Sequence, residues 1–190
     1  DKIIAILAKR LKTEGRLNDN KVVTTVMSNM GFENHLNENE IDLIRANVGD
    51  RYVLEKMKAH GLNLGGEQSG HIIMLDYNTT GDGVLTSLQL AQAIRDEGKS
   101  LEALVEDIKD WPQLLINVRV DNDKKSIWAK NNVVTSFIEQ KEKEMNGMGR
   151  VLVRTSGTEP IIRVMTEGKD KEQVERVARE IAEVVEKELN

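Results

Sequence analysis

The feature that most constrains the fold is an alternation of short apolar runs with longer helical segments through the first part of the chain. Ile4, Leu7 and Leu11 mark one face of an amphipathic helix, and residues 22–27 follow as a buried strand. In chain order, the pattern then predicts a short helix near Phe32, a strand at 41–45, a helix at 51–58, strands flanking 65–71, and helices at 83–95 and 101–108. Alternating strands and helices predict an α/β sandwich built on a mixed sheet.

Trp111-Pro112 ends this alternation, because proline cannot continue a helix and restricts the backbone of the residue before it. Beyond it the sequence predicts a strand at 114–120, a helix at 126–143, two strands around 154–160 and a final helix at 171–189. This order indicates a small α+β domain with helices on one face of an antiparallel sheet. We therefore expect two domains, residues 1–112 and residues 113–190.

The composition excludes several classes of function. A net charge of −5 and an aromatic content of 3% argue against a nucleic-acid partner, which needs a basic surface and stacking platforms. No apolar run reaches the roughly 20 residues that span a bilayer, and no signal-peptide pattern is seen, so we expect no membrane partner and a cytoplasmic location. The absence of cysteine excludes thiol catalysis, disulfides and thiolate zinc sites.

Residues 154–160, Arg-Thr-Ser-Gly-Thr-Glu-Pro, form a hydroxyl-rich turn between two β-branched runs. Gly157 lets the backbone approach an anion, while Ser156, Thr158 and successive backbone N–H groups suit an oxyanion nest. Arg154 and Arg163 each offer a guanidinium for bidentate contact with phosphate. An ordinary tight turn remains the alternative, since Ser, Gly and Thr are common turn residues.

Residues 65–71, Gly-Gly-Glu-Gln-Ser-Gly-His, form a second polar loop, in which we expect the three glycines to bend the chain sharply. Glu67 can accept two hydroxyl protons, Ser69 can donate or accept, and His71 can do either. This combination suits a polyol such as a sugar. A hairpin whose polar side chains only cap the turn is the alternative.

Together with four further segments, these two loops resemble the carboxyl-terminal half of the α-D-phosphohexomutases. The matching segments are residues 25–31, 48–56, 65–71, 79–83, 116–119 and 154–164. They are spread over nearly the whole chain, which makes the resemblance far more specific than one motif. The pairing of Gly-Asp-Arg-Tyr at 49–52 with the loop at 65–71 resembles the members that act on glucosamine phosphates rather than glucose or mannose phosphates.

The resemblance implies a four-domain enzyme of which this chain holds the third domain, with the sugar-binding loop, and the fourth, with the phosphate-binding loop. Such an enzyme passes a phosphoryl group from a phosphoserine to a sugar monophosphate, through a bisphosphate that also serves as primer. Its product would lead to UDP-N-acetylglucosamine and cell-wall precursors. The implied partners are glucosamine phosphate and the missing amino-terminal domains of the same enzyme, which carry the phosphoserine and the Mg²⁺ ligands. A homodimer stays open.

The resemblance also assigns roles residue by residue. The non-reacting phosphate would lie on Arg154, Ser156, Gly157, Thr158 and Arg163, and the sugar hydroxyls on Glu67 and Ser69. His71 and Arg51 are the catalytic candidates, placed near the reacting oxygens. For Arg51, pairing with Asp50 or Glu55 is an equal alternative.

Nothing in the sequence supplies a serine nucleophile or a magnesium site. The segment Thr80-Gly-Asp-Gly83 offers one carboxylate, Asp82, which we expect to cap the next helix, and the same is expected of Asp121 and Asp123. We therefore predict no metal site in this chain and no mutase activity without the missing domains. Two other functions remain open: a sibling mutase acting on glucose or mannose phosphates, and a non-catalytic sugar-phosphate-binding module.

Overall fold

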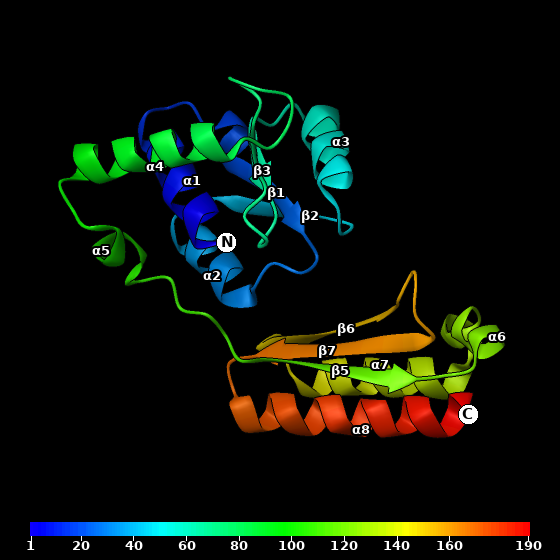
Figure 1. The fold of residues 1–190 in the computed structure, drawn as a ribbon. Coiled ribbons are helices and arrows are strands. Elements are labelled where there is room, and N and C mark those ends of the chain that lie inside the picture. Colours follow the sequence, from blue (N-terminus) through cyan, green and yellow to red (C-terminus); the bar gives the residue numbers. More distant parts are fainter. The chain divides into compact units, whose positions relative to one another are not determined.

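The computed structural model describes all 190 residues, which divide into two compact units, Asp1–Asp110 and Trp111–Asn190 (Figure 1). The first unit contains a four-stranded sheet of order β2-β1-β3-β4. Its strands are β1 Lys21–Thr25, β2 Asp42–Ala46, β3 Leu64–Gly66 and β4 Ile72–Met74. β1 pairs in parallel with β2 and β3, whereas β4 pairs antiparallel with β3. The mixed sheet predicted for this part of the chain is therefore confirmed.

Helices cover both faces of this sheet. They are α1 Lys2–Thr13, α2 Met30–Glu38, α3 Asp50–His60, α4 Gly83–Glu97 and α5 Leu101–Val105, with a 3₁₀ turn at Asn18–Asn20. Because side chains alternate across a strand, Val22 packs with α1 and α2 while its neighbour Val23 packs with α3. β1 is thus buried on both sides, as a strand with helices on both faces of its sheet requires.

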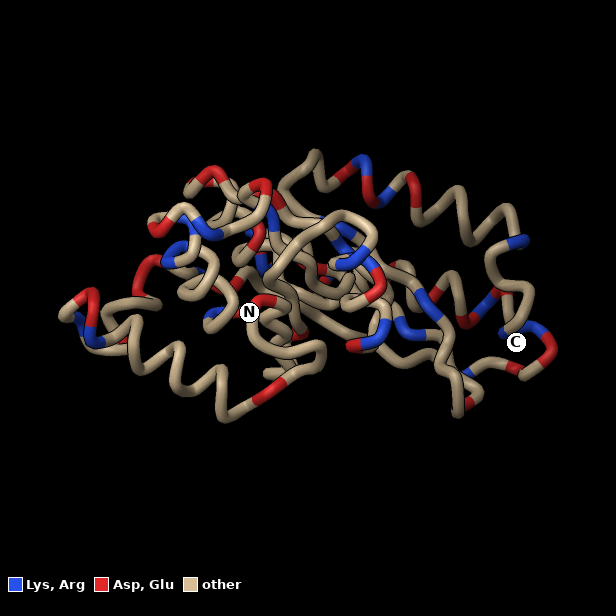
Figure 2. The backbone as a smooth tube through the Cα atoms, turned by 90° about the horizontal axis from the view of Figure 1, so that it is seen from above, with Lys and Arg blue, Asp and Glu red and all other residues tan.

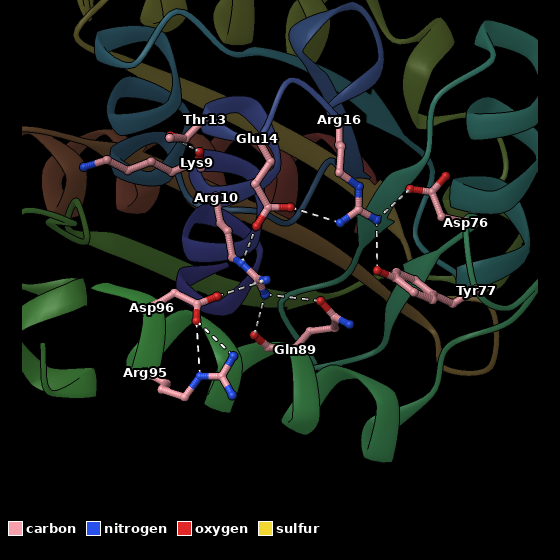
Figure 3. A network of polar contacts seen from close by, with 10 residues as sticks. All are labelled: Lys9, Arg10, Thr13, Glu14, Arg16, Asp76, Tyr77, Gln89, Arg95 and Asp96. Atoms are coloured by element: carbon pink, nitrogen blue, oxygen red, sulfur yellow. Dashed lines mark hydrogen bonds and ion pairs between the residues drawn. The ribbon is translucent and has the colours of Figure 1, made fainter. Parts of the chain in front are cut away.

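Two arginines join α1 to the segment that follows β4 (Figure 3). Arg10 donates to the backbone and side-chain oxygens of Gln89 on α4 at 3.2 Å. Arg16 donates to the hydroxyl of Tyr77 at 2.9 Å. Glu14 pairs with both guanidinium groups, at 2.8 Å and 3.0 Å. These contacts hold Tyr77, in the segment after β4, and Gln89, in the middle of α4, against α1 and the residues that follow it.

The second unit is a three-stranded antiparallel sheet of order β5-β7-β6 with its long helices on one face (Figure 1). The strands are β5 Gln113–Arg119, β6 Gly149–Thr155 and β7 Ile161–Gly168. The helices are α6 Asn122–Lys125, α7 Asn132–Glu144 and α8 Lys171–Leu189, with a 3₁₀ turn at Trp128–Lys130. Val118, Ile162 and Val164 pack against Val177 and Ile181 of α8. The predicted α+β arrangement is confirmed.

Three details differ from the sequence-based expectations. The helix expected at 126–143 is interrupted, because Asn131 is extended and its side chain caps α7 by accepting from the N–H groups of Val133 and Val134. The helix expected at 101–108 ends at Val105. Asp121 stands at the N-cap position of α6, but its side chain accepts no capping hydrogen bond.

Basic and acidic residues are interspersed along both units (Figure 2). No helix is both long enough and apolar enough to cross a membrane.

We expect the junction between the units to be the first site of proteolysis. Lys109 is exposed, whereas Ile108 before it is buried in the first unit and the carbonyl of Pro112 accepts from Gly168 N in the second. Limited trypsin digestion followed by mass spectrometry should therefore cut after Lys109 before it cuts after Arg45 in β2 or Arg163 in β7. Early cleavage inside those strands, with the junction intact, would contradict the presence of two separately folded domains.

Candidate functional site

The turn at 67–70 joins β3 to β4 and presents the polar side chains of the first loop. Gly65 and Gly66 lie in β3 and not in the turn, so the expectation that all three glycines bend the loop is wrong for these two. A Cβ on Gly65 would lie 2.6 Å from Met57 Sδ, and one on Gly66 would lie 2.7 Å from the carbonyl of His71. These glycines therefore allow close strand packing, while Gly70, with φ +95°, makes the turn itself.

Glu67 is held by the backbone at the start of α3. Its Oε1 accepts from Gly49 N–H at 3.0 Å, and its own N–H donates to the carbonyl of His71 at 2.9 Å. Ser69 is exposed, and its hydroxyl forms no hydrogen bond within the chain. The turn thus orients one carboxylate firmly and leaves one hydroxyl available.

A groove of ≈ 370 Å³ runs beside this turn. It is lined by Glu67, Gln68 and Gly70 and by residues at the start of α1, including Lys2, which pairs with Asp110 at 2.8 Å. The volume lies within the usual range for small-molecule sites, roughly 300–1,000 Å³.

Asp50 and Gly81 both lie against the ring of His71. Nε2 lies 3.4 Å from Oδ2 of Asp50, the first residue of α3. Gly81 is close to the same nitrogen, since a Cβ on it would lie 2.3 Å from Nε2. Neither Asp50 nor Gly81 was a candidate in the sequence, because the fold alone brings residues 50, 71 and 81 together.

Arg51, the other catalytic candidate, is engaged elsewhere. Its Nε donates to Oε1 of Glu55 at 2.8 Å, and the side chain is 81% exposed. Glu55 accordingly raises the pKa of the Arg51 guanidinium. This is the ion pair that the sequence offered as the alternative role. Asp82 caps α4 as expected: it accepts from Leu85 N–H at 2.9 Å, and this bond lowers its pKa.

The second candidate site lies where β6 turns into β7. Arg154 and Arg163 are directly opposite each other in the two strands, so both project from the sheet face away from α7 and α8. Asn117 on β5 is opposite Arg163 and extends the row. Burial, and next the charge of Arg163, lower the pKa of Arg154.

Only one carboxylate offsets this pair of positive charges. Glu159 pairs with Arg163 at 3.3 Å, whereas Arg154 has no ion-pair or hydrogen-bond partner. Nε of Arg163 is buried and also without a partner. Two guanidinium groups held side by side repel each other, so an anion bound between them would relieve that repulsion.

The turn Ser156–Pro160 supplies further donors. Ser156 is buried, and its Oγ accepts from Glu159 N–H at 3.3 Å, so part of its hydrogen-bonding capacity serves the turn. The N–H groups of Gly157 and Thr158 and the Thr158 hydroxyl donate to no protein acceptor. Around a Cβ on Gly157 there would be no atom within 4 Å, so the turn is open at this point. The unused donors match the nest expected from the sequence.

The chain contains no group of three or more His, Cys, Asp or Glu side chains that could hold a metal ion. His35 is buried on α2, and burial, with a further contribution from Lys9, lowers its pKa. Near the turn at 67–70, Glu67 accepts from Gly49 N–H, and Asp50 lies against His71. Mg²⁺ takes several oxygen ligands, and these two carboxylates do not form such a set.

Two family models match the chain. Residues 1–111 match "Phosphoglucomutase/phosphomannomutase, alpha/beta/alpha domain III", and residues 115–184 match "Phosphoglucomutase/phosphomannomutase, C-terminal domain". The two matches cover both units.

Curated relatives named phosphoglucosamine mutase match over the whole chain. The relative from Fusobacterium nucleatum subsp. nucleatum is 63% identical over 190 residues, and that from Caldicellulosiruptor saccharolyticus is 52% identical. In both cases the match covers 100% of this chain and 42% of the relative. The chain therefore spans less than half the length of these relatives.

Solved structures share the fold. The N-acetylphosphoglucosamine mutase of Aspergillus fumigatus superposes with a TM-score of 0.78 at 18% identity, covering 98% of this chain and 43% of that one. A structure of the same fungal enzyme with GlcNAc-6P and magnesium gives a TM-score of 0.68 at 18% identity, covering 97% and 46%. At these identities the likeness concerns the fold alone.

Gly81→Ala should displace the His71 ring from Asp50, because the new Cβ would overlap Nε2 and Cδ2 of the imidazole. The ring signals of His71 in an NMR spectrum should then shift. Gly83→Ala is the matched control, since a Cβ there would meet nothing within 4 Å and should leave His71 unchanged. Identical His71 signals in Gly81→Ala and the parent would refute this placement of the ring.

Arg154→Ala should weaken the binding of inorganic phosphate by about 1.5 to 3 kcal/mol, the usual net value of a hydrogen bond to a charged group. Isothermal titration calorimetry measures the change, and circular dichroism should stay unaltered. Arg179→Ala serves as the control, because it removes an equal charge from an exposed position on α8. Equal phosphate affinity in Arg154→Ala and the parent would exclude this arginine from the anion site.

Proposed function

The chain belongs to the phosphoglucomutase/phosphomannomutase family, and on that premise we propose that it is the substrate-holding part of a phosphoglucosamine mutase. The enzyme would interconvert glucosamine 6-phosphate and glucosamine 1-phosphate. The 63% identity to the Fusobacterium nucleatum relative favours this substrate over glucose or mannose phosphates. The product would enter the route to UDP-N-acetylglucosamine and the cell wall.

The observation that carries the proposal is the set of unused donors around the turn Ser156–Pro160. Arg154, Nε of Arg163 and the N–H groups of Gly157 and Thr158 lack protein acceptors. They would bind the phosphate that does not react. A remote clamp of this kind contributes to rate, because phosphoryl transfer depends mainly on positioning and charge stabilisation.

The turn at 67–70 would hold the sugar. We assign residues 1–112 as the third, sugar-binding domain and residues 113–190 as the fourth, phosphate-binding domain. Glu67, oriented by Gly49 N–H, would accept hydrogen bonds from two sugar hydroxyls, and the free hydroxyl of Ser69 would add a third contact. Contacts of this kind fix the orientation of the ring relative to the clamped phosphate.

His71 would take or give a proton at the reacting hydroxyl, and Asp50 would hold its ring in place. Arg51 is the weaker catalytic candidate, because its guanidinium would first have to leave Glu55. The chain offers no serine beside an activating base. We therefore assign the phosphoserine to the part of the enzyme outside this chain.

Magnesium and a sugar bisphosphate primer would also act through that part. The residues of this chain do not fit Mg²⁺, since no cluster of ligands is available to hold it. The relative from Aspergillus fumigatus has been crystallised with magnesium and, in another structure, with glucose 1,6-bisphosphate. By analogy, the missing domains would bring the phosphoserine and the metal to the sugar phosphate that this chain holds.

The chain alone should therefore show no mutase activity. It would be incubated with glucosamine 6-phosphate, magnesium and glucosamine 1,6-bisphosphate, and the 1-phosphate followed by ³¹P NMR. We expect no turnover above a control without protein. Binding of the substrate should remain, although weakened, because fewer contacts offset the cost of ordering the ligand.

The full-length enzyme is the positive control under the same conditions. It should convert glucosamine 6-phosphate faster than glucose 6-phosphate or mannose 6-phosphate. Sustained turnover by the chain alone would mean that the catalytic residues are misassigned. A full-length enzyme that prefers glucose or mannose phosphate would identify a sibling mutase instead.

A further inference from the structure

One lysine supports the turn Ser156–Pro160 through two of its carbonyls. Nζ of Lys125, the last residue of α6, donates to the carbonyls of Ser156 and Glu159, at 2.8 Å in each case. These are the first and fourth residues of the turn. The lysine is half-buried, and its ammonium has no other partner. A single cation thus joins the first and fourth residues of the turn.

This arrangement sets the direction of the Gly157 N–H group. In a planar trans peptide the carbonyl of one residue and the N–H of the next point in opposite directions. Because the carbonyl of Ser156 points to Lys125, the N–H of Gly157 points away from it. The carbonyl of Glu159 belongs to the peptide bond with Pro160, which has no N–H. The hydrogen bond from Lys125 to this carbonyl therefore sets the direction of no N–H group.

The same contact strengthens the donor. A hydrogen bond from a charged group polarises the peptide unit that accepts it, which leaves the N–H of that unit a better donor. The other hydrogen bonds within the turn are neutral. Ser156 N–H donates to the carbonyl of Ile161 at 3.0 Å, Ile161 N–H donates to the carbonyl of Glu159 at 2.9 Å, and Glu159 N–H donates to Ser156 Oγ at 3.3 Å. Among these hydrogen bonds to the backbone of the turn, those from Lys125 are the ones made by a charged group.

We propose that Lys125 is a positioning residue of the anion site: it holds the carbonyls of Ser156 and Glu159 so that the N–H of Gly157 faces the bound phosphate. The inference rests on the proposed phosphate-binding role of the turn. It adds a residue from α6, about thirty positions away in the sequence, to a site whose other members lie in the turn and its two strands.

The chain provides a matched control in the neighbouring residue. Lys124 lies on the same short helix, and its Nζ donates to a main-chain oxygen of the terminal residue Asn190 at 2.7 Å. Lys124→Met therefore removes the same charge and a hydrogen bond without touching the turn. Lys125→Arg keeps a cation that can still donate to two carbonyls.

The test uses the 190-residue chain labelled with ¹⁵N, without ligand and then titrated with inorganic phosphate. Without ligand, Lys125→Met should shift the Gly157 amide signal, whereas Lys124→Met should not. With phosphate, Lys125→Met should bind about tenfold more weakly, the loss expected when a charged hydrogen bond is removed. Lys125→Arg should stay closer to the parent. Thermal unfolding checks that each variant is folded, and Lys125→Gln replaces the Met variant if that one is not.

An unchanged Gly157 signal together with unchanged phosphate affinity in Lys125→Met would overturn the proposal. Equal losses in Lys125→Met and Lys124→Met would also overturn it, since the effect would then be one of overall charge. If the parent itself binds no phosphate, the proposed role of the turn fails. The ligand-free Gly157 shift then still decides whether Lys125 sets the geometry of the turn.

Discussion

The pairing of β6 with β7 is the constraint on which the second unit's chemistry depends. Their register sets Arg154 opposite Arg163, on the sheet face that α7 and α8 leave uncovered. Like charges directly opposite each other destabilise a sheet, and Glu159 compensates only one of them. The hydrophobic face of the same strands, packed on α8, fixes this register, because a slip of β6 by one residue would turn Arg154 into the core. The packing of the core therefore holds two like charges close together, and a bound anion would reduce the repulsion between them.

In the first unit, close packing of the backbone fixes the positions of the polar groups. Gly65 and Gly66 let β3 lie against α3 and β4, and Gly81 leaves room for the imidazole of His71. Asp50 then contacts that ring from the start of α3, while the neighbouring Gly49 N–H orients the carboxylate of Glu67. In both units, buried elements hold a few polar groups in fixed directions, which is what a site that works by positioning requires.

The sequence predicted the elements whose signal is local. The stripe on α8, the cap at Asp82 and the fold class of both units follow from periodicity and residue type, and all are found in the structure. The break before α7 was missed because the apolar pattern continues across Asn131, whereas the capping bond of that side chain interrupts the helix. Lys125 could not be found in this way, since its two acceptors are distant in sequence and are backbone atoms.

Binding of phosphate by Arg154 and Arg163 together can be followed through the Nε–H signals of their side chains. Each signal would be assigned in ¹⁵N-labelled chain by substitution with lysine and followed during titration with inorganic phosphate. If the two arginines share the anion, both signals should shift along one saturating curve, with a shared dissociation constant, while Arg179 on α8 stays unchanged. Shifts spread evenly over exposed arginines, or none at positions 154 and 163, would contradict shared binding.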